Sequence, residues 1–208
     1  EAESAADNNL DPYWEDKIER LSHICEEVNV RTHVAFTATA ILAKATDPEV
    51  DLFAIKPEHS DSPNAFSARS LCHNVIVPLS AELGVNIGVT GREPLNNMPY
   101  FRMRSLDDGT PVRGGAKPAY DCALEIIREL VDAGPDETRK ALRAFIGVRR
   151  RYQPSYAAHD PSATVTPGRL AAIVAEFVGE ASENGKRAQA VVAGLMDVFA
   201  APERVDGG

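Results

Sequence analysis

The chain has 208 residues, of which 44% are hydrophobic and 25% are charged. These proportions are ordinary for a globular protein with enough chain to bury a core, so general disorder is excluded. No run of about 18 apolar residues is present, which excludes a membrane-spanning helix. The formal charge of −9, from 31 acidic and 22 basic residues, argues at first sight against a nucleic-acid partner.

The negative charge is concentrated at the N-terminal end. Residues 1–27 contain nine acidic and two basic residues, a net charge of −7, which leaves −2 for the remainder of the chain. Residues 139–151 contain six basic residues and no acidic one. An acidic total therefore does not exclude DNA as a partner, because basic side chains are gathered away from the acidic end.

We expect a piece of a longer protein, because the chain begins without Met and its last four residues are typical of a loop. The first residues show no signal-peptide pattern. Three widely spaced cysteines in apolar surroundings, Cys25, Cys72 and Cys122, indicate buried free thiols in a reducing cytoplasm. No Cys-x-x-Cys pair is present and the five histidines are scattered, so no structural zinc site is expected.

Three helices are predicted in the first part of the chain, after a disordered tail of residues 1–10. The first begins at Asp11, followed by Pro at its first helical position, and has an apolar stripe opposite an acidic face. The second covers residues 32–45 with Thr as its cap. The third begins near Ser67 and is kinked or divided by Pro78, and Gly84 closes it.

The helical period disappears between residues 85 and 115. Residues 85–89 and 100–104 are typical of short strands, and Asp108 with Gly109 is a hairpin-turn signal, so one small β-ribbon is predicted. Helices followed by a ribbon also match the order of a winged helix-turn-helix, and a winged-helix-like core is one candidate arrangement.

Helices resume at about 118–133 and 136–150, and two more follow a loop at 153–166, the last at about 185–200. The fold is therefore expected to be mainly α, with about seven helices. We expect residues 11–208 to form a single helical domain, with candidate sub-boundaries near 115 and within 153–166.

The start of the third helix carries the first set of candidate contact residues. Ser67, Arg69, Ser70 and His73 share its exposed side, and Arg69 lies one helical turn from His73. We expect Arg69 and His73 to enter a groove of DNA or to hold its rim.

Residues 88–102 are the most unusual segment, because glycines and prolines restrict the backbone while basic, amide and aromatic side chains decorate it. Arg92 can contact guanine or phosphate, and Asn96 and Asn97 can contact adenine. Tyr100 and Phe101 are expected either to stack on a base or to enter the core. The alternative is a rigid connecting loop in which both Asn side chains bond the backbone.

Five further arginines are candidate phosphate contacts. Basic side chains suit the C-terminal end of a helix, but three in succession exceed that need, which favours phosphate binding by the basic run. The five are Arg102, Arg104, Arg149, Arg150 and Arg151.

No catalytic motif is found in the chain. The sequence lacks G-x-S-x-G, H-E-x-x-H, a Walker loop and G-x-G-x-x-G. A metal-dependent nuclease needs converging carboxylates to hold Mg²⁺, and the Asp and Glu-x-Lys spacing that would supply them is absent. We therefore assign neither catalytic residues nor a metal site to this chain.

Two dense motifs closely resemble the amino-terminal half of SacI-type restriction endonucleases. They are AFSARSLCHNVIVP at residues 65–78, continuing through residues 82–84, and GREPLNNMPYFR at residues 91–102. The similarity is looser at 32–51 and 189–199, and it spans most of residues 32–200. The resemblance implies a DNA-recognition half of a restriction enzyme of a restriction-modification system, with a PD-(D/E)xK nuclease segment expected beyond residue 208.

The leading hypothesis is sequence-specific binding of double-stranded DNA in the cytoplasm, without a membrane and with a homodimer as one candidate assembly. The resemblance implies Mg²⁺ as cofactor of the full-length enzyme and none for this chain. One alternative is a reader of methylated or backbone-modified DNA. Another is a protein-interaction or scaffold domain that uses the acidic first helix, and a third is that the chain is itself a nuclease.

Overall fold

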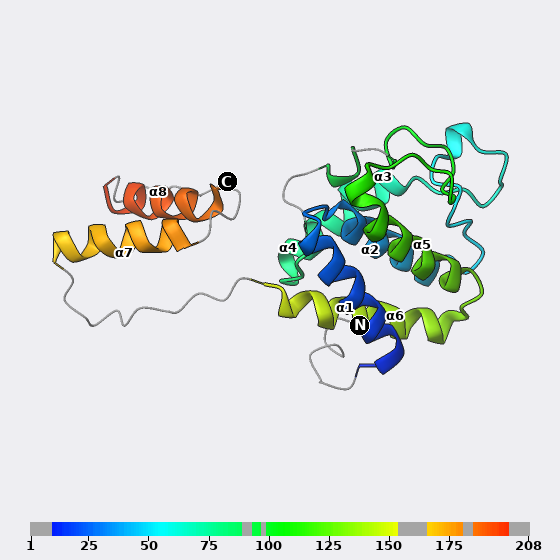
Figure 1. The fold of residues 1–208 in the computed structure, drawn as a ribbon, viewed down its shortest axis with the longest axis horizontal. Helices are drawn as coiled ribbons and strands as arrows, with labels where there is room; N and C mark the ends of the chain where they lie inside the picture. The colour runs from blue at the N-terminus through cyan, green and yellow to red at the C-terminus, as the bar shows by residue number, and fades with distance from the viewer. Residues whose placement is uncertain (1–9, 89–92, 97–98, 154–165, 181–184, 200–208) are drawn as a thin grey trace. The chain divides into compact units, whose positions relative to one another are not determined.

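The computed structural model describes residues 10–88, 93–96, 99–153, 166–180 and 185–199. The chain divides into two compact units, Glu1–Pro154 and Ser155–Gly208. The first unit contains helices α1 to α6 and the second contains α7 and α8 (Figure 1). The division lies at the start of the loop in which the sequence indicates a candidate sub-boundary.

Helix α1, Pro12–Glu27, begins as predicted. The side chain of Asp11 caps it by accepting hydrogen bonds from the backbone N–H groups of Tyr13 (3.1 Å) and Trp14 (3.3 Å). The apolar stripe of α1, which includes Trp14 and Ile18, is buried. The Asp-Pro pair therefore predicted the start of this helix, and the apolar periodicity predicted its packing face.

Helix α2, Thr32–Thr46, lies in the middle of the first unit and contacts α1, α5 and α6. It is buried on nearly all sides, and its polar side chains bond internally: the hydroxyls of Thr37 and Thr39 donate to the backbone carbonyls four residues earlier, at 2.8 Å each. The predicted Thr cap is wrong, because Arg31 occupies the N-cap position and makes no side-chain capping bond.

The third helix is continuous but not regular. It consists of α3, Ala68–Leu71, a π-helical turn η3, Cys72–Ile76, and α4, Val77–Glu82. Pro78 lacks a backbone N–H, and the helix continues through it from the π turn, in which the N–H of Val77 bonds the carbonyl of Cys72. Gly84 follows the helix with a φ of 63°, as expected for a glycine that ends one.

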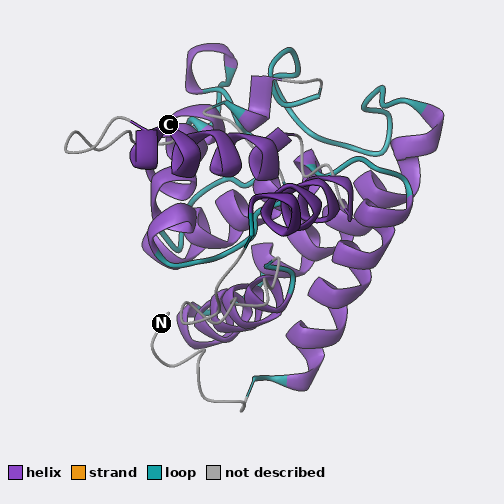
Figure 2. Cartoon of the chain, turned by 90° about the vertical axis from the view of Figure 1, so that its left-hand side faces the viewer, coloured by secondary structure: helices purple, strands orange, loops and turns teal. Residues whose placement is uncertain are grey.

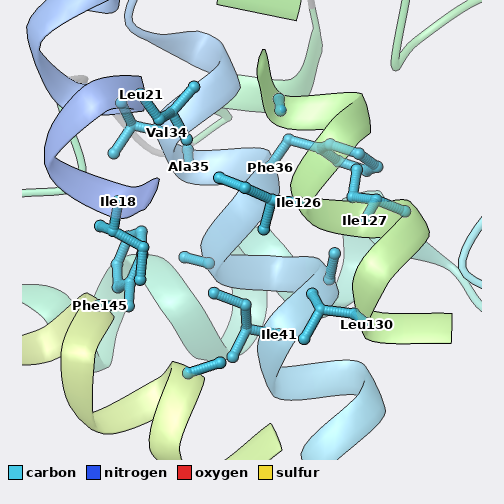
Figure 3. Close-up of a cluster of buried hydrophobic side chains, with 14 of the residues drawn as sticks. Ile18, Leu21, Val34, Ala35, Phe36, Ile41, Ile126, Ile127, Leu130 and Phe145 are labelled. Carbon is cyan, nitrogen blue, oxygen red and sulfur yellow. The ribbon is translucent and has the colours of Figure 1, made fainter. Parts of the chain in front are cut away.

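Helices α5, Lys117–Val131, and α6, Pro135–Arg151, complete the core of the first unit. Figure 3 shows Ile18 and Leu21 of α1 and Phe145 of α6 against α2, with Ile126, Ile127 and Leu130 of α5 on another side. The three cysteines, which the sequence predicts to be buried free thiols, are free and buried.

The predicted β-ribbon is wrong for the part of residues 85–115 that the structure describes. No strand forms there, and short 3₁₀ turns occur at η4, Pro94–Asn96, and η5, Gly114–Ala116 (Figure 2). The alternating apolar residues of this segment do not pair with another strand, because Val85, Ile87 and Tyr100 insert separately into the helical core. A winged-helix-like core needs a β-ribbon as its wing, and the described residues form none.

A further short 3₁₀ turn, η2, covers Pro57–His59.

The second unit contains α7, Pro167–Glu180, and α8, Lys186–Phe199. Arg187 joins them, because its guanidinium donates to the carbonyl of Phe177 (2.8 Å) and to the carboxylate of Glu180 (2.6 Å). Several large apolar side chains of α8 remain exposed, which is common for a unit too small to enclose a core. The described part of the fold is thus mainly helical, with about seven helices when α3, η3 and α4 are counted as one.

Candidate functional site

Four of the predicted contact residues lie together in one pocket. The pocket has a volume of about 380 Å³ and is formed by the segment before and within η2 and by the start of the third helix. We call it the Arg69 pocket, and its lining residues are Ile55, Lys56, Glu58, Ser67, Arg69, Ser70, His73 and Asn74. The structure therefore brings Ser67, Arg69, Ser70 and His73 to a shared concave surface.

The local sequence explains why these side chains converge. Ser67 caps α3, since its Oγ accepts a hydrogen bond from the backbone N–H of Ser70 at 3.3 Å and donates one to Ser70 Oγ at 2.8 Å. The parallel bridge between Asp51 and Ala65 holds the segment before η2 beside the segment before α3. Residues more than ten positions apart in the chain thereby line the same pocket.

Sequence reasoning missed Lys56 at this place, and it considered Phe101 only for stacking on a base or for the core. Phe101 is exposed, and two cations lie over its ring: Arg69 Cζ at 4.8 Å and Lys56 Nζ at 5.6 Å from the ring centroid. Cation–π contacts of this kind orient long basic side chains. A single Lys before a Pro gives no signal in the sequence, because only the fold places it next to Arg69.

His73 connects the pocket to η4. Its Nε2 accepts a hydrogen bond from the backbone N–H of Leu95 at 3.4 Å. Burial lowers the pKa of His73, the carboxylate of Glu93 partly opposes this effect, and Arg69 adds to it. The imidazole is therefore neutral at pH 7, as the accepted hydrogen bond requires.

Two predicted contact residues, Asn96 at the end of η4 and Tyr100 after it, differ in exposure. Asn96 donates a side-chain hydrogen bond to Glu93, and its Oδ1 is buried without a partner. Tyr100 is 1% exposed, stacks on Phe36 with ring centroids 4.1 Å apart, and shares a 2.5 Å hydrogen bond with His33 Nδ1. Of its two expected roles, Tyr100 therefore has the core role, and we remove it from the candidate DNA contacts.

The three arginines that end α6 are occupied within the fold. Arg149 is completely buried, its Nε donates to the carbonyl of Asn86 at 2.6 Å, and burial lowers its pKa. Arg150 donates to the carbonyl of Leu83 at 3.1 Å. We remove the buried Arg149 from the candidate phosphate contacts, because a phosphate cannot reach it on this surface.

Arg151 is half-exposed and contacts α1. Its guanidinium pairs with Glu15 at 2.7 Å and Glu19 at 2.5 Å. Together with Arg149 and Arg150, it fastens the end of α6 to neighbouring segments. The basic run thus has a structural explanation that its sequence did not reveal.

The segment leading into the unusual loop is anchored by this arrangement. The Asn86 side chain donates to the carbonyl of Tyr152 at 2.7 Å and accepts from the backbone N–H of Gly88 at 2.8 Å. Gly88 has a φ of 81°, and an added Cβ would lie 3.1 Å from Arg31 Cβ, so a side chain is not tolerated easily there. Two other predicted contacts, Arg92 and Asn97, lie outside the described residues and stay predictions.

Ion pairing separates the basic side chains of the first unit into two groups. Those of α1, α5 and α6 are largely paired with acids, as in Lys17 with Glu129 (2.7 Å) and Arg128 with Asp108 (2.7 Å). No described basic side chain between residues 56 and 113 has a carboxylate of a described residue within 4.0 Å. These side chains are Lys56, Arg69, Arg102, Arg104 and Arg113, and the last three are exposed.

The described residues contain no group of three or more His, Cys, Asp or Glu side chains that could hold a metal ion. None of their helices combines the length and apolar character that crossing a membrane requires.

The helical unit and its surface belong to a known class of domain. The family model for the SacI restriction endonuclease N-terminal domain matches residues 2–149, and the chain therefore belongs to this family. A curated relative is the type II restriction enzyme SacI of Streptomyces achromogenes, which is 38% identical over 146 residues. The alignment covers 70% of this chain and 39% of that enzyme, so the chain spans about two fifths of the relative's length. The resemblance seen in the two sequence motifs is confirmed.

Proposed function

We propose that this chain is a module that recognises double-stranded DNA by sequence. The observation that carries the proposal is the group of basic side chains between residues 56 and 113 that lack acidic partners among the described residues. Cations without internal partners are the side chains that can replace the counterions of a DNA backbone. Membership of the SacI restriction endonuclease N-terminal domain family supports a DNA target.

The proposed contacts follow from exposure and pairing. Arg102 and Arg104 are exposed and bind phosphates, while Arg69 and His73 face the DNA from the Arg69 pocket. Arg92 and Asn97 read base edges, since Arg and Asn form the bidentate contacts that distinguish guanine and adenine. Asn96 is left out of this set because its Oδ1 is buried and its amide nitrogen bonds Glu93. Arg151 is left out of this set because it pairs with α1.

The proposal is tested by fluorescence anisotropy with a random duplex pool at two salt concentrations. Each phosphate contact contributes about −0.9 to the slope of log K against log salt, so a six-contact interface weakens steeply as salt rises. Arg102→Ala is expected to reduce the slope by about one contact. Arg139→Ala is the matched control, because Arg139 is equally exposed but already paired with Asp136.

The target sequence is obtained by selecting bound duplexes from the pool. In the selected duplex, Arg92→Ala is expected to cost about 1–3 kcal/mol of binding free energy and to relax specificity at one position. An equal, small loss on all sequences would make Arg92 a phosphate contact instead. Failure of the wild-type chain to bind any duplex at low salt, plain, methylated or backbone-modified, would refute the proposal.

The whole protein is proposed to cleave DNA through a segment beyond this chain, with Mg²⁺ as its cofactor. Incubation of the chain alone with Mg²⁺ and the selected duplex is expected to yield no product, and cleavage would overturn that division. A two-fold target would require two copies of the module, which sedimentation with and without duplex measures. The scaffold alternative is disfavoured, because acids of α1 such as Glu15, Glu19 and Glu26 already pair with arginines of the same unit.

A further inference from the structure

We propose that the Arg69 pocket is a discrete phosphate site that takes one phosphate group of the DNA backbone. This inference rests on the proposed DNA recognition and assigns the ligand of one part of that surface. The pocket is concave, about 380 Å³ in volume, and lined mainly by polar side chains. A phosphate bound there would contact two chain segments, the one before and within η2 and the start of the third helix. A phosphate bound by the exposed Arg102 and Arg104 would lie on an open surface.

The charges that line the pocket are unbalanced toward the positive. Lys56 and Arg69 are cationic, His73 is neutral at pH 7, and Glu58 is the acid of the set. Neither Lys56 nor Arg69 has a carboxylate of a described residue within ion-pair distance, so Glu58 does not neutralise them. An anion is therefore the ligand class that this lining favours.

Hydrogen-bond donors in the pocket are left without acceptors. The Arg69 Nε is buried and has no hydrogen-bond partner, so the hydrogen bonds of this guanidinium are not completed within the described fold. Ser67 Oγ donates to Ser70 Oγ, which leaves the Ser70 hydroxyl proton available. A tetrahedral phosphate offers several acceptor oxygens, and a charged acceptor bonds such donors more strongly than a neutral one.

Phe101 fixes the geometry of the two cations. Lys56 Nζ and Arg69 Cζ both lie within 5.6 Å of its ring centroid, so the ring orients both basic side chains at the pocket. A bound phosphate would place negative charge beside these cations. The ring therefore pre-orders the pocket, and little side-chain freedom is lost on binding.

The first experiment uses inorganic phosphate as the probe and backbone amide NMR as the readout. In the full chain at low ionic strength, phosphate is expected to shift the resonances of residues 67–74, whereas chloride at matched ionic strength is not. Lys56→Met and Arg69→Gln should each abolish the shifts. Arg139→Ala should leave them unchanged, and a circular dichroism spectrum confirms that each variant is folded.

The second experiment uses the selected duplex with one phosphate at a time replaced by an uncharged methylphosphonate. At one position of the duplex, replacing the phosphate by methylphosphonate is expected to weaken binding by the wild-type chain. The same replacement should leave binding by Arg69→Gln unchanged. The same variant should lower the salt slope by about one contact.

The outcomes separate the pocket from the function. Steep salt-dependent DNA binding that is unchanged in Lys56→Met and Arg69→Gln, with no phosphate shifts, would overturn the phosphate site and leave DNA recognition standing. Phosphate shifts in a chain that binds no duplex would keep the site and refute its DNA ligand. Resonance shifts caused by phosphate, together with one duplex position that is sensitive to methylphosphonate, would support both the phosphate site and DNA recognition.

Discussion

The buried pair of His33 and Tyr100 predicts how the stability of the first unit depends on pH. His33 is 2% exposed, and burial lowers its pKa from 6.5 to about 4. Its Nδ1 bonds the Tyr100 hydroxyl at 2.5 Å, and its Nε2 is buried without a partner. No described acid pairs with the ring, so no carboxylate of the described residues stabilises the imidazolium form in the folded state.

The size and sign of the effect follow from that shift. Above pH 6.5 the ring is neutral in both the folded and the unfolded chain, and the full stability is present. As the pH falls below 6.5, only the unfolded chain binds the proton, so the free energy of unfolding decreases until about pH 4. Each pKa unit is worth about 1.4 kcal/mol, which gives about 2 kcal/mol lost at pH 5 and about 3 kcal/mol at pH 4.

Urea denaturation followed by circular dichroism, between pH 4 and 7.5, measures this dependence. Because other groups also titrate, the relevant quantity is the difference between the wild-type chain and His33→Gln, which has no ionisable group at this position. The exposed His23 provides a control for the loss of an imidazole, and His23→Gln should retain the decrease in the free energy of unfolding that the burial of His33 causes. Parallel curves for the wild type and His33→Gln between pH 6.5 and 4.5 would refute the reasoning.

Three further perturbations test other contacts of the first unit. Asn86→Ala removes the bonds to Tyr152 and Gly88 and should lower the free energy of unfolding by about 2 kcal/mol in urea titrations. Arg151→Ala breaks exposed ion pairs, so it should cost at most about 1 kcal/mol and leave the salt slope of DNA binding unchanged. Trp14→Phe removes the 2.6 Å bond from the indole to Glu137 and should cost about 1.5–3 kcal/mol. The pKa of Glu137, held low by Lys140 and then by Trp14, should also rise in an NMR titration of Trp14→Phe.

Periodicity predicted the helices well where one face meets the core and the other meets solvent. Helices α1, α5 and α6 have such faces, and their sequence ranges agree with the structure within a few residues. The ribbon predicted after Gly84 is wrong because alternating apolar residues show that every second side chain is buried. They do not show whether a strand or a helix covers those side chains. Val85 and Ile87 alternate correctly and are buried, yet helices cover them.

The candidate site was predictable in part, because a sequence shows charge but not pairing. The cluster at Ser67, Arg69, Ser70 and His73 shared one helical face, and the structure brings these residues into one pocket. Arg149 and Arg102 are equally basic in the sequence, but one is completely buried and the other is exposed. That difference arises from the position of α6 against the segment at Asn86, which no local pattern encodes.

The π turn at Cys72–Ile76 acts as a one-residue insertion within the third helix. It offsets the angular phase of α4 by about 100° relative to α3, so the two halves do not follow one common stripe. Leu79 is 41% exposed although its spacing from Leu71 would place both on one face of a regular helix. His73 and Asn74, which line the Arg69 pocket, sit within this turn. Deleting a single residue of this turn would restore a regular helix and change the orientation of α4 relative to Ser67 and Arg69, so the π turn sets how the two halves of the third helix are oriented around the Arg69 pocket.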